Sequence, residues 1–180
     1  DPCEVVLEAC AVSHHWARQI AQIGHRVRLI SPQHVKPFRR GQKNDYRDAE
    51  AIISAALSPG MHFVGVKRVE QQAEQALHRV RSRLLSHRNA AASELRGLLG
   101  EYGLAFSKGI KPLRAGAVRF ADSEQAQALG LVDLVWDVLE ELDQLQQRLD
   151  GYTHRIEQRV RNDVTSQRLR DELLDRKSVV

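Results

Sequence analysis

Three carboxylates in the first fifty residues have the types and the spacing of a divalent-metal site. Asp45 and Asp48 are three residues apart, so on a helix their side chains project from one face. Glu8 closes an apolar run over residues 5–7 that is typical of a strand, whose end can point toward such a helix. Oxygen ligands of this kind suit Mg²⁺ or Mn²⁺, and beside a basic surface they indicate metal-assisted chemistry on a phosphate backbone.

Each carboxylate also has a purely structural interpretation. Asp45 could be a helix N-cap, Asp48 could complement the helix dipole in the first turn, and Glu8 could be a surface residue at a strand end. An isolated Asp-x-x-Asp pattern favours these structural roles. The conjunction of three carboxylates with flanking cations and a strand–helix–strand order favours the metal site.

The segments before residue 31 predict a parallel βαβ unit. Strands are expected over residues 3–7 and 27–30, with a helix over residues 14–23 between them. Ser13 is expected to cap this helix, and Trp16 is expected to pack it onto the sheet. Short links of this kind imply a right-handed crossover between parallel strands.

The following segments complete an α/β domain that we expect to span residues 1–68. A short helix is expected from Pro32 through Val35, and Pro37 prevents it from continuing. The helix that carries Asp45 and Asp48 comes next, and a last short strand is expected over residues 63–66. The apolar side of that helix is expected to consist of Ala49, Ile52, Ile53 and Ala56.

From residue 69 the pattern predicts long helices that form a helical hairpin or a coiled coil. Residues 69–121 are expected to form a basic helix followed by a loop over residues 108–119, which is rich in Gly, Lys and Arg. Residues 122–180 are expected to form an acidic heptad helix with a frayed tail, through which the chain could form a homo-oligomer. The seam of this helix is Leu131, Val135, Val138, Leu142, Leu145, Leu149, Tyr152 and Ile156.

The distribution of charge indicates a polyanionic partner. The chain has a net charge of +4, but residues 59–121 carry 11 Lys and Arg against 4 Asp and Glu, whereas residues 122–180 carry 8 against 13. A basic middle of this kind is typical of nucleic-acid binding, although solvated helix faces give the same composition.

The basic side chains fall into two groups that we expect to contact phosphates. One group precedes the Asp45 helix, and the other lies on the first long helix, where Arg81 and Arg88 share one face and Arg79 and Arg83 share another. Phosphate contacts carry no sequence information by themselves. The candidate nucleic-acid-binding residues are Lys36, Arg39, Arg40, Lys43, Asn44, Arg79, Arg81, Arg83 and Arg88.

Cysteine content and hydropathy narrow the class of protein further. Cys3 and Cys10 provide neither a disulfide framework nor a zinc spacing, so we expect reduced, partly buried thiols in a cytoplasmic protein. No stretch approaches the roughly 18 apolar residues that span a bilayer, and no membrane partner is expected.

Several short words follow one another in a fixed order over residues 3–106. They are Glu8-Ala9-Cys10, Ser13 to Arg18, Gly24 to Ile30, Pro32 to Phe38, Lys43-Asn44-Asp45-x-x-Asp48-Ala49, Glu70-Gln71-Gln72, Leu77 to Arg81 and Leu95 to Gly103. Any one word is weak, but the ordered set is specific. It resembles the DEDD transposases of the insertion sequence 110 family.

The resemblance implies an RNase H-like domain of the RuvC type, with Mg²⁺ or Mn²⁺ at an Asp-Glu-Asp-Asp tetrad. Glu8, Asp45 and Asp48 match the last three members of the tetrad, and Lys43 and Asn44 match the residues that flank it. The first aspartate of the family lies on an earlier strand. We therefore expect that ligand, the first strands and a C-terminal serine domain to be absent from this chain.

The same resemblance implies DNA transposition and recombination by strand cleavage and exchange. DNA and an element-encoded guide RNA are the expected partners, in the bacterial cytoplasm and at the nucleoid. With a ligand and the serine domain absent, we expect weak metal binding and little strand transfer. The alternatives are a non-catalytic nucleic-acid-binding and dimerisation remnant of a disrupted insertion sequence, a helical assembly module, or a Holliday-junction resolvase, which explains the acidic helix poorly.

Overall fold

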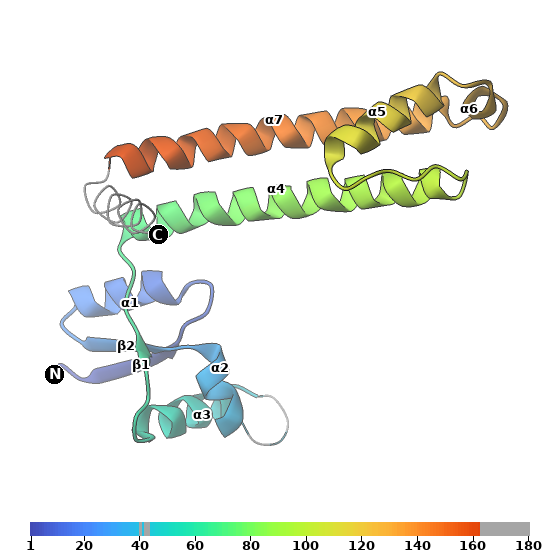
Figure 1. Cartoon of the computed structure of the whole chain (residues 1–180). Helices are drawn as coiled ribbons and strands as arrows, with labels where there is room; N and C mark the ends of the chain where they lie inside the picture. The colour runs from blue at the N-terminus through green and yellow to red at the C-terminus, as the bar shows by residue number, and fades with distance from the viewer. Residues whose placement is uncertain (40, 42–43, 163–180) are drawn as a thin grey trace, which may run out of the picture. The chain divides into compact units, whose positions relative to one another are not determined.

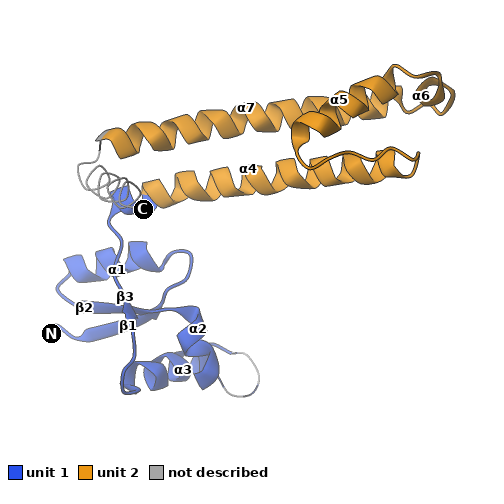
Figure 2. Cartoon of the chain, viewed as in Figure 1, with its two compact units in different colours: residues 1–72 blue, residues 73–180 orange. Residues whose placement is uncertain are grey.

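The computed structural model describes residues 1–39, 41 and 44–162 (Figure 1). The chain divides into two compact units, residues 1–72 and residues 73–180 (Figure 2). The first unit is a mixed α/β structure, and the regular secondary structure described for the second unit, up to residue 162, is helical. Predictions that concern Arg40, Lys43 and the tail from residue 163 fall outside the described residues.

The α/β unit is built on a three-stranded sheet in the order β1-β2-β3. Strand β1 (Glu4–Glu8) pairs in parallel with β2 (Arg26–Ile30), in a register that sets Glu8 opposite Ile30. Helix α1 (Ser13–Gln22) connects them, which confirms the predicted βαβ unit. The short strand β3 (Phe63–Val64) pairs antiparallel with β2.

Helices cover both faces of this sheet. Figure 1 shows α1 on one side and α3 (Asp45–Leu57) on the other. Successive strand residues point to opposite faces, and β2 ends in the fully buried pair Leu29 and Ile30. Ile30 packs with Ala51 and Ala55 of α3, whose small side chains let the helix approach the sheet closely.

The predicted apolar side of α3 is only half correct. Ile52 and Ala56 pack against the core cluster, but Ile53 is 58% exposed and Ala49 is exposed. The sheet-facing stripe is set by the buried Ala51 and Ala55, four residues apart, and Ile53 lies off that stripe.

Two predictions for α1 are wrong. Ser13 is the first residue of the helix rather than its cap, and its Oγ donates a hydrogen bond to the Cys10 carbonyl at 2.9 Å. Trp16 is 54% exposed, because the face that packs on the sheet consists of Ser13, His14 and Ala17. Trp16 precedes Ala17 in the sequence and projects from a different side of the helix.

The chain after β2 runs through short helical turns. Helix α2 (Pro32–Val35) begins at Pro32, as predicted. It ends at Val35, also as predicted, and a 3₁₀ turn, η1 (Lys36–Phe38), follows it. Arg39 follows with extended backbone.

The strand that leaves the sheet is held by α1. The backbone N–H of Lys67 donates to Nδ1 of the buried His14 at 3.1 Å, and the Lys67 carbonyl accepts from Arg18 Nη1 at 2.6 Å. Both polar groups of one peptide segment are therefore satisfied by side chains of a single helix.

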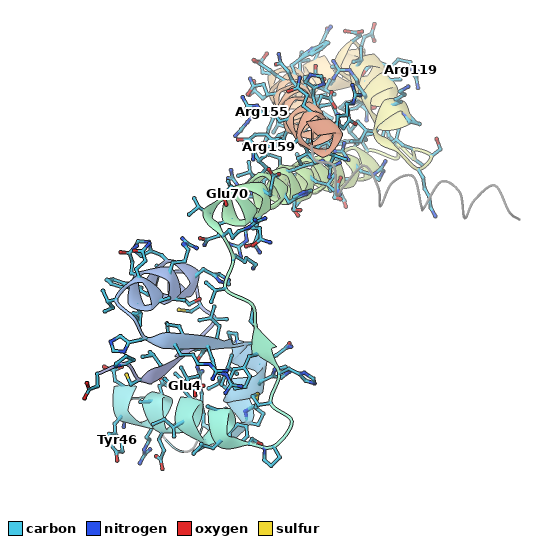
Figure 3. The ribbon with its side chains drawn as sticks, turned by 90° about the vertical axis from the view of Figure 1, so that its left-hand side faces the viewer. Glu4, Tyr46, Glu70, Arg119, Arg155 and Arg159 are labelled. Carbon is cyan, nitrogen blue, oxygen red and sulfur yellow. The ribbon has the colours of Figure 1, made fainter. Side chains whose placement is uncertain are left out.

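The helical unit is dominated by two long helices, α4 (Val69–Gly100) and α7 (Val132–Asn162), which run alongside each other in Figures 1 and 3. Their apolar faces form two buried clusters. Helix α5 (Ile110–Ala121) contributes to the larger one, and the smaller one consists of Leu84, Leu145 and Leu149. Helix α6 (Glu124–Ala128) connects α5 with α7. The buried residues include Leu95, Leu99, Leu113, Ala117, Phe120, Val135, Leu139 and Leu142.

The predicted loop over residues 108–119 is wrong, since α5 occupies most of it. Leu113, Ala117 and Phe120 recur at helical spacing and are buried, and Pro112 falls in the first turn, where proline is tolerated. Along α7 four seam predictions are buried, Val135, Leu142, Leu145 and Leu149, but Leu139 is the buried side chain where Val138 was expected.

Two smaller findings concern the cysteines and the membrane. Cys3 and Cys10 are exposed, so the expectation of partly buried thiols is wrong. Within the part of the chain that the structure describes, no helix combines the length and the apolar character needed to cross a membrane.

A glycine in α5 supplies a test of this packing. The Phe106 ring lies so close to Gly116 that a Cβ there would come within 2.0 Å of it. We expect Gly116→Ala to lower the free energy of unfolding by about 1–3 kcal/mol, measured by urea denaturation followed by circular dichroism. Gly151→Ala in α7 is the control, because a Cβ there meets nothing within 4 Å and should stabilise by about 0.5–1 kcal/mol. Equal effects of the two substitutions would contradict the contact.

Candidate functional site

The carboxyl end of β1 places Glu8 beside the segment that follows β2. Parallel strands end at the same edge of a sheet, and the ladder extends one residue further through the bond from Ala9 N–H to the Ile30 carbonyl at 2.7 Å. The chain then turns through α2 and η1 and returns to this edge at Arg39. Ligand sites in α/β sheets commonly lie at such carboxyl ends.

Arg39 joins two of the predicted carboxylates. Its Nη2 lies 2.7 Å from Glu8 Oε2, and its Nε lies 3.4 Å from Asp48 Oδ1. The side chains of Glu8 and Asp48 are 19% and 27% exposed, and that of Arg39 is 40% exposed. Glu8 and Asp48 are distant in sequence, and the structure brings them within reach of one guanidinium.

Helix α3 orients Asp48 through its start and its packing. Asn44 is the N-cap, and its Oδ1 accepts the Arg47 N–H at 2.8 Å. The predicted alternative of Asp45 as the cap is therefore wrong. Asp48 lies in the first turn on the side of Ala51 and Ala55, which face the sheet, and this position brings its carboxylate to the sheet edge.

Asp45 remains apart from this pair. It is the first residue of α3 and is exposed, and the ion pairs of Arg39 involve Glu8 and Asp48 instead. Across residues 1–39, 41 and 44–162, no three His, Cys, Asp or Glu side chains gather closely enough to hold a metal ion. A pair does gather, and Mg²⁺ commonly takes one or two protein carboxylates while water and substrate phosphates complete its shell. Glu8 and Asp48 could supply these two carboxylates. The Arg39 guanidinium contacts both of them and so takes the position of a shared cation.

The basic residues that precede α3 have different surroundings in the structure. Lys36 is exposed in η1, Arg39 pairs with the carboxylates, and Asn44 caps α3. Arg40 and Lys43 lie outside the described residues. The expectation that these side chains contact nucleic acid stays a prediction.

The second basic group lies on α4 and has two faces, as the spacing predicts. Arg81 Nε donates to Thr153 Oγ1 at 2.9 Å, and Arg88 Nη1 donates to Gln146 Oε1 at 2.7 Å, so both are engaged with α7. Arg79 and Arg83 are exposed, one turn apart. The exposed pair is the better placed of the two for contact with a phosphate backbone.

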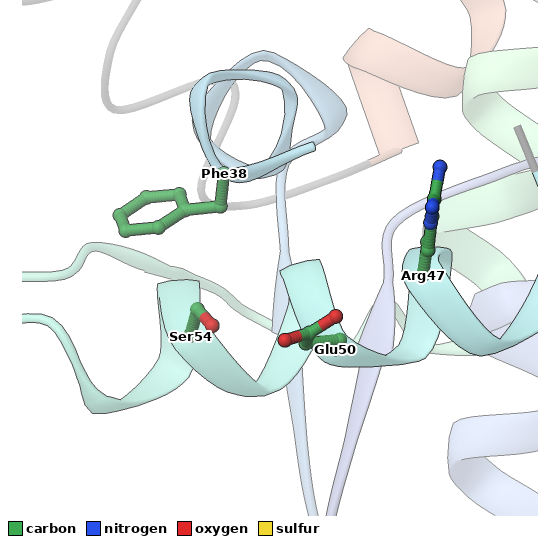
Figure 4. Close-up of a pocket in the computed structure, with 4 residues that line it drawn as sticks. All are labelled: Phe38, Arg47, Glu50 and Ser54. Atoms are coloured by element: carbon green, nitrogen blue, oxygen red, sulfur yellow. The ribbon is translucent and has the colours of Figure 1, made fainter. Parts of the chain in front are cut away.

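Sequence reasoning missed a small pocket between η1 and α3. Phe38 from η1 and three side chains of α3, Arg47, Glu50 and Ser54, line a cavity of about 130 Å³ (Figure 4). Arg47 also packs against Gly41, which adopts a φ of +71° and where a Cβ would come within 2.2 Å of its guanidinium. The i, i+3, i+7 spacing along α3 was a usable signal, but Phe38 could not be assigned to it without the fold. Tyr46, on the same helix, is 81% exposed (Figure 3).

Comparison with known proteins matches nearly the whole chain. The probable family 20 transposase of Pseudomonas aeruginosa is 44% identical over 175 residues, and the transposase for insertion sequence element IS1328 of Yersinia enterocolitica is 38% identical over 168 residues. Each alignment covers 93% of this chain and 50% of the relative. The transposase for insertion sequence element IS1111A of Coxiella burnetii is 50% identical over 107 residues, which are 59% of this chain and 29% of that protein.

These relatives are bacterial insertion-sequence transposases, and the chain is homologous to part of them. Over nearly all of its length the chain is similar to transposases of the IS110/IS1111/IS1328 family, which confirms the resemblance noted from its motifs. The chain spans about half the length of the Pseudomonas aeruginosa and Yersinia enterocolitica relatives. No protein-family profile matches the chain. No solved structure matches it either.

The cap of α3 gives a test of how the site is positioned. We expect Asn44→Ala to remove the bond to the Arg47 N–H, which should lower the stability of the α/β unit by about 1 kcal/mol and speed hydrogen exchange at residues 46–48. Asn44→Asp keeps an acceptor oxygen and should behave like the parent chain. Unchanged exchange in Asn44→Ala would contradict this account of the cap.

Proposed function

We propose that this chain is the metal-binding and helical part of a DNA transposase, which acts by metal-assisted cleavage and exchange of phosphodiester strands. The observation that carries the proposal is the meeting of Glu8 and Asp48 on a single guanidinium. This occurs in a chain whose relatives are insertion-sequence transposases. A shared cation between carboxylates at the end of parallel strands is what a phosphoryl-transfer site needs.

In this proposal Glu8 and Asp48 hold Mg²⁺ or Mn²⁺, and Asp45 extends the site from one turn earlier on the helix. The ion, when bound, supplies Lewis-acid stabilisation of charge on a scissile phosphate. The strand–helix–strand order and the position of the carboxylates support an RNase H-like fold of the RuvC type.

Nucleic-acid binding is the second part of the proposal. DNA is the expected partner, and an element-encoded guide RNA would be held by the same phosphate contacts. Arg79 and Arg83 support this role through their exposure, with Lys36 on the α/β unit. Arg81 and Arg88, engaged with α7, would contribute positive charge behind them.

Self-association is the third part. Helix α7 leaves Leu134 and Trp136 each 43% exposed, and Leu129 just before it is 48% exposed. Apolar side chains at the surface of a long helix support a homo-oligomer. The heptad seam of α7 is buried within the helical unit, so the proposed contact between chains involves these exposed side chains instead.

The metal site is tested by removing one carboxylate. We expect the chain to bind Mn²⁺ and Asp48→Asn to weaken that binding more than about tenfold, because losing a ligand costs at least as much as losing a residue that supports one. Electron paramagnetic resonance of free Mn²⁺ measures the affinity. Glu50→Gln removes the same charge from the same helix and should leave the affinity unchanged. An equal loss in both variants would show a diffuse charge effect instead of a site.

The nucleic-acid face is tested by the salt dependence of binding. We expect a fluorescent duplex to bind with an affinity that falls with salt, and Arg79→Gln with Arg83→Gln to reduce the slope of log K against log salt by about two. Arg148→Gln on α7 is the control, since it removes one exposed cation from an acidic helix.

Stronger binding of an element-end RNA than of duplex DNA would support a guide RNA as a partner. Binding that survives loss of the carboxylates without any cleavage would favour a non-catalytic remnant, and no binding at low salt would contradict this part of the proposal.

A further inference from the structure

Arg39 occupies a different position from the other surface arginines that form ion pairs. Arg28 contacts one carboxylate, that of Glu4, at 2.9 Å. Arg39 uses two different nitrogen atoms on two carboxylates, one from a strand and one from a helix. A guanidinium so placed holds two elements of the α/β unit together through charge.

The two carboxylates need a cation between them. Glu8 and Asp48 are both largely shielded from solvent, at 19% and 27% exposed, and both approach the same group. Two like charges brought together at partial burial repel each other, and an interposed positive charge offsets this repulsion. A divalent ion bound between the two carboxylates competes with Arg39 for Glu8 Oε2 and Asp48 Oδ1, and the positive charge of the guanidinium repels it.

We propose that Arg39 is the resident counter-cation of this carboxylate pair, and that it exchanges with the divalent metal ion. The inference rests on the proposed function, since it assigns a role to Arg39 at the metal site proposed there. The guanidinium holds Glu8 and Asp48 in position before the metal arrives, and metal binding requires its departure. Arg39 is thus a positioning residue and a competitor of the metal.

The surroundings of Arg39 allow such an exchange. Its side chain is 40% exposed, and its backbone is extended directly after η1, so departure requires a change of rotamer without a break in a helix or strand. Partly exposed ion pairs are individually weak, which keeps the exchange within the reach of a metal ion. Once released, the planar fork of an arginine matches a phosphate group.

The experiment compares Mn²⁺ affinity and melting temperature across variants of the full 180-residue chain. Mn²⁺ is titrated against the parent chain, Arg39→Gln, Arg39→Lys and the control Arg28→Gln. Melting temperatures are then measured in EDTA and in saturating Mn²⁺.

Arg39→Gln should bind Mn²⁺ about fivefold more tightly, because the metal no longer displaces an ion pair. It should melt at a lower temperature than the parent in EDTA and recover more of that loss with Mn²⁺. Arg39→Lys keeps the charge and loses the fork, so it should bind about twofold more tightly, and it decides the question if Arg39→Gln does not fold. Arg28→Gln should match the parent in affinity.

Two results would overturn the inference, and they differ in what they say about the proposed function. Equal or weaker Mn²⁺ binding by the Arg39 variants, with Asp48→Asn still impaired, removes the exchange and leaves the metal site in place. No Mn²⁺ binding by either the parent or the Arg39 variants removes both the exchange and the metal part of the proposed function.

Discussion

The parallel register of β1 and β2 is the constraint on which the rest of the α/β unit depends. It sets Glu8 opposite Ile30, so the first strand ends where the second one ends. The chain that leaves Ile30 therefore begins its turn at the edge that already carries a carboxylate. A shift by one residue would move Glu8 to the other face of the sheet, away from both Arg39 and α3.

Packing of α3 converts this edge into a site. Ala51 and Ala55 are small enough to bring the helix close to Ile30, and their stripe carries Asp48 at its beginning. Asn44 fixes where the helix starts and hence which residues fall in its first turn. The geometry of the carboxylate pair thus follows from apolar contacts and one capping bond as much as from charge.

The sequence was informative where a local pattern dominates. Apolar runs and short links predicted β1, α1 and β2, and the apolar residues after Asp48 predicted the helix that carries it. Trp16 was misplaced because its helical spacing with Ile20 and Ile23 suggested a packed side, whereas the side of α1 that faces the sheet carries Ala17. Helix α5 was missed because glycine, proline and basic residues masked the spacing of Leu113, Ala117 and Phe120. The role of Arg39 depends on two carboxylates distant in the sequence, which no local pattern encodes.

The hold of α1 on Lys67 has a mechanical consequence. His14 and Arg18 fasten the N–H and the carbonyl of one residue just before α4 begins at Val69. Tension that arrives along the chain from α4 is therefore passed into α1 before it reaches β3, whose pairing with β2 involves only two residues. The two side-chain hydrogen bonds therefore bear this tension before the short pairing of β3 with β2 does. Force applied to the helices thus reaches the sheet edge that carries Glu8 only after these bonds break.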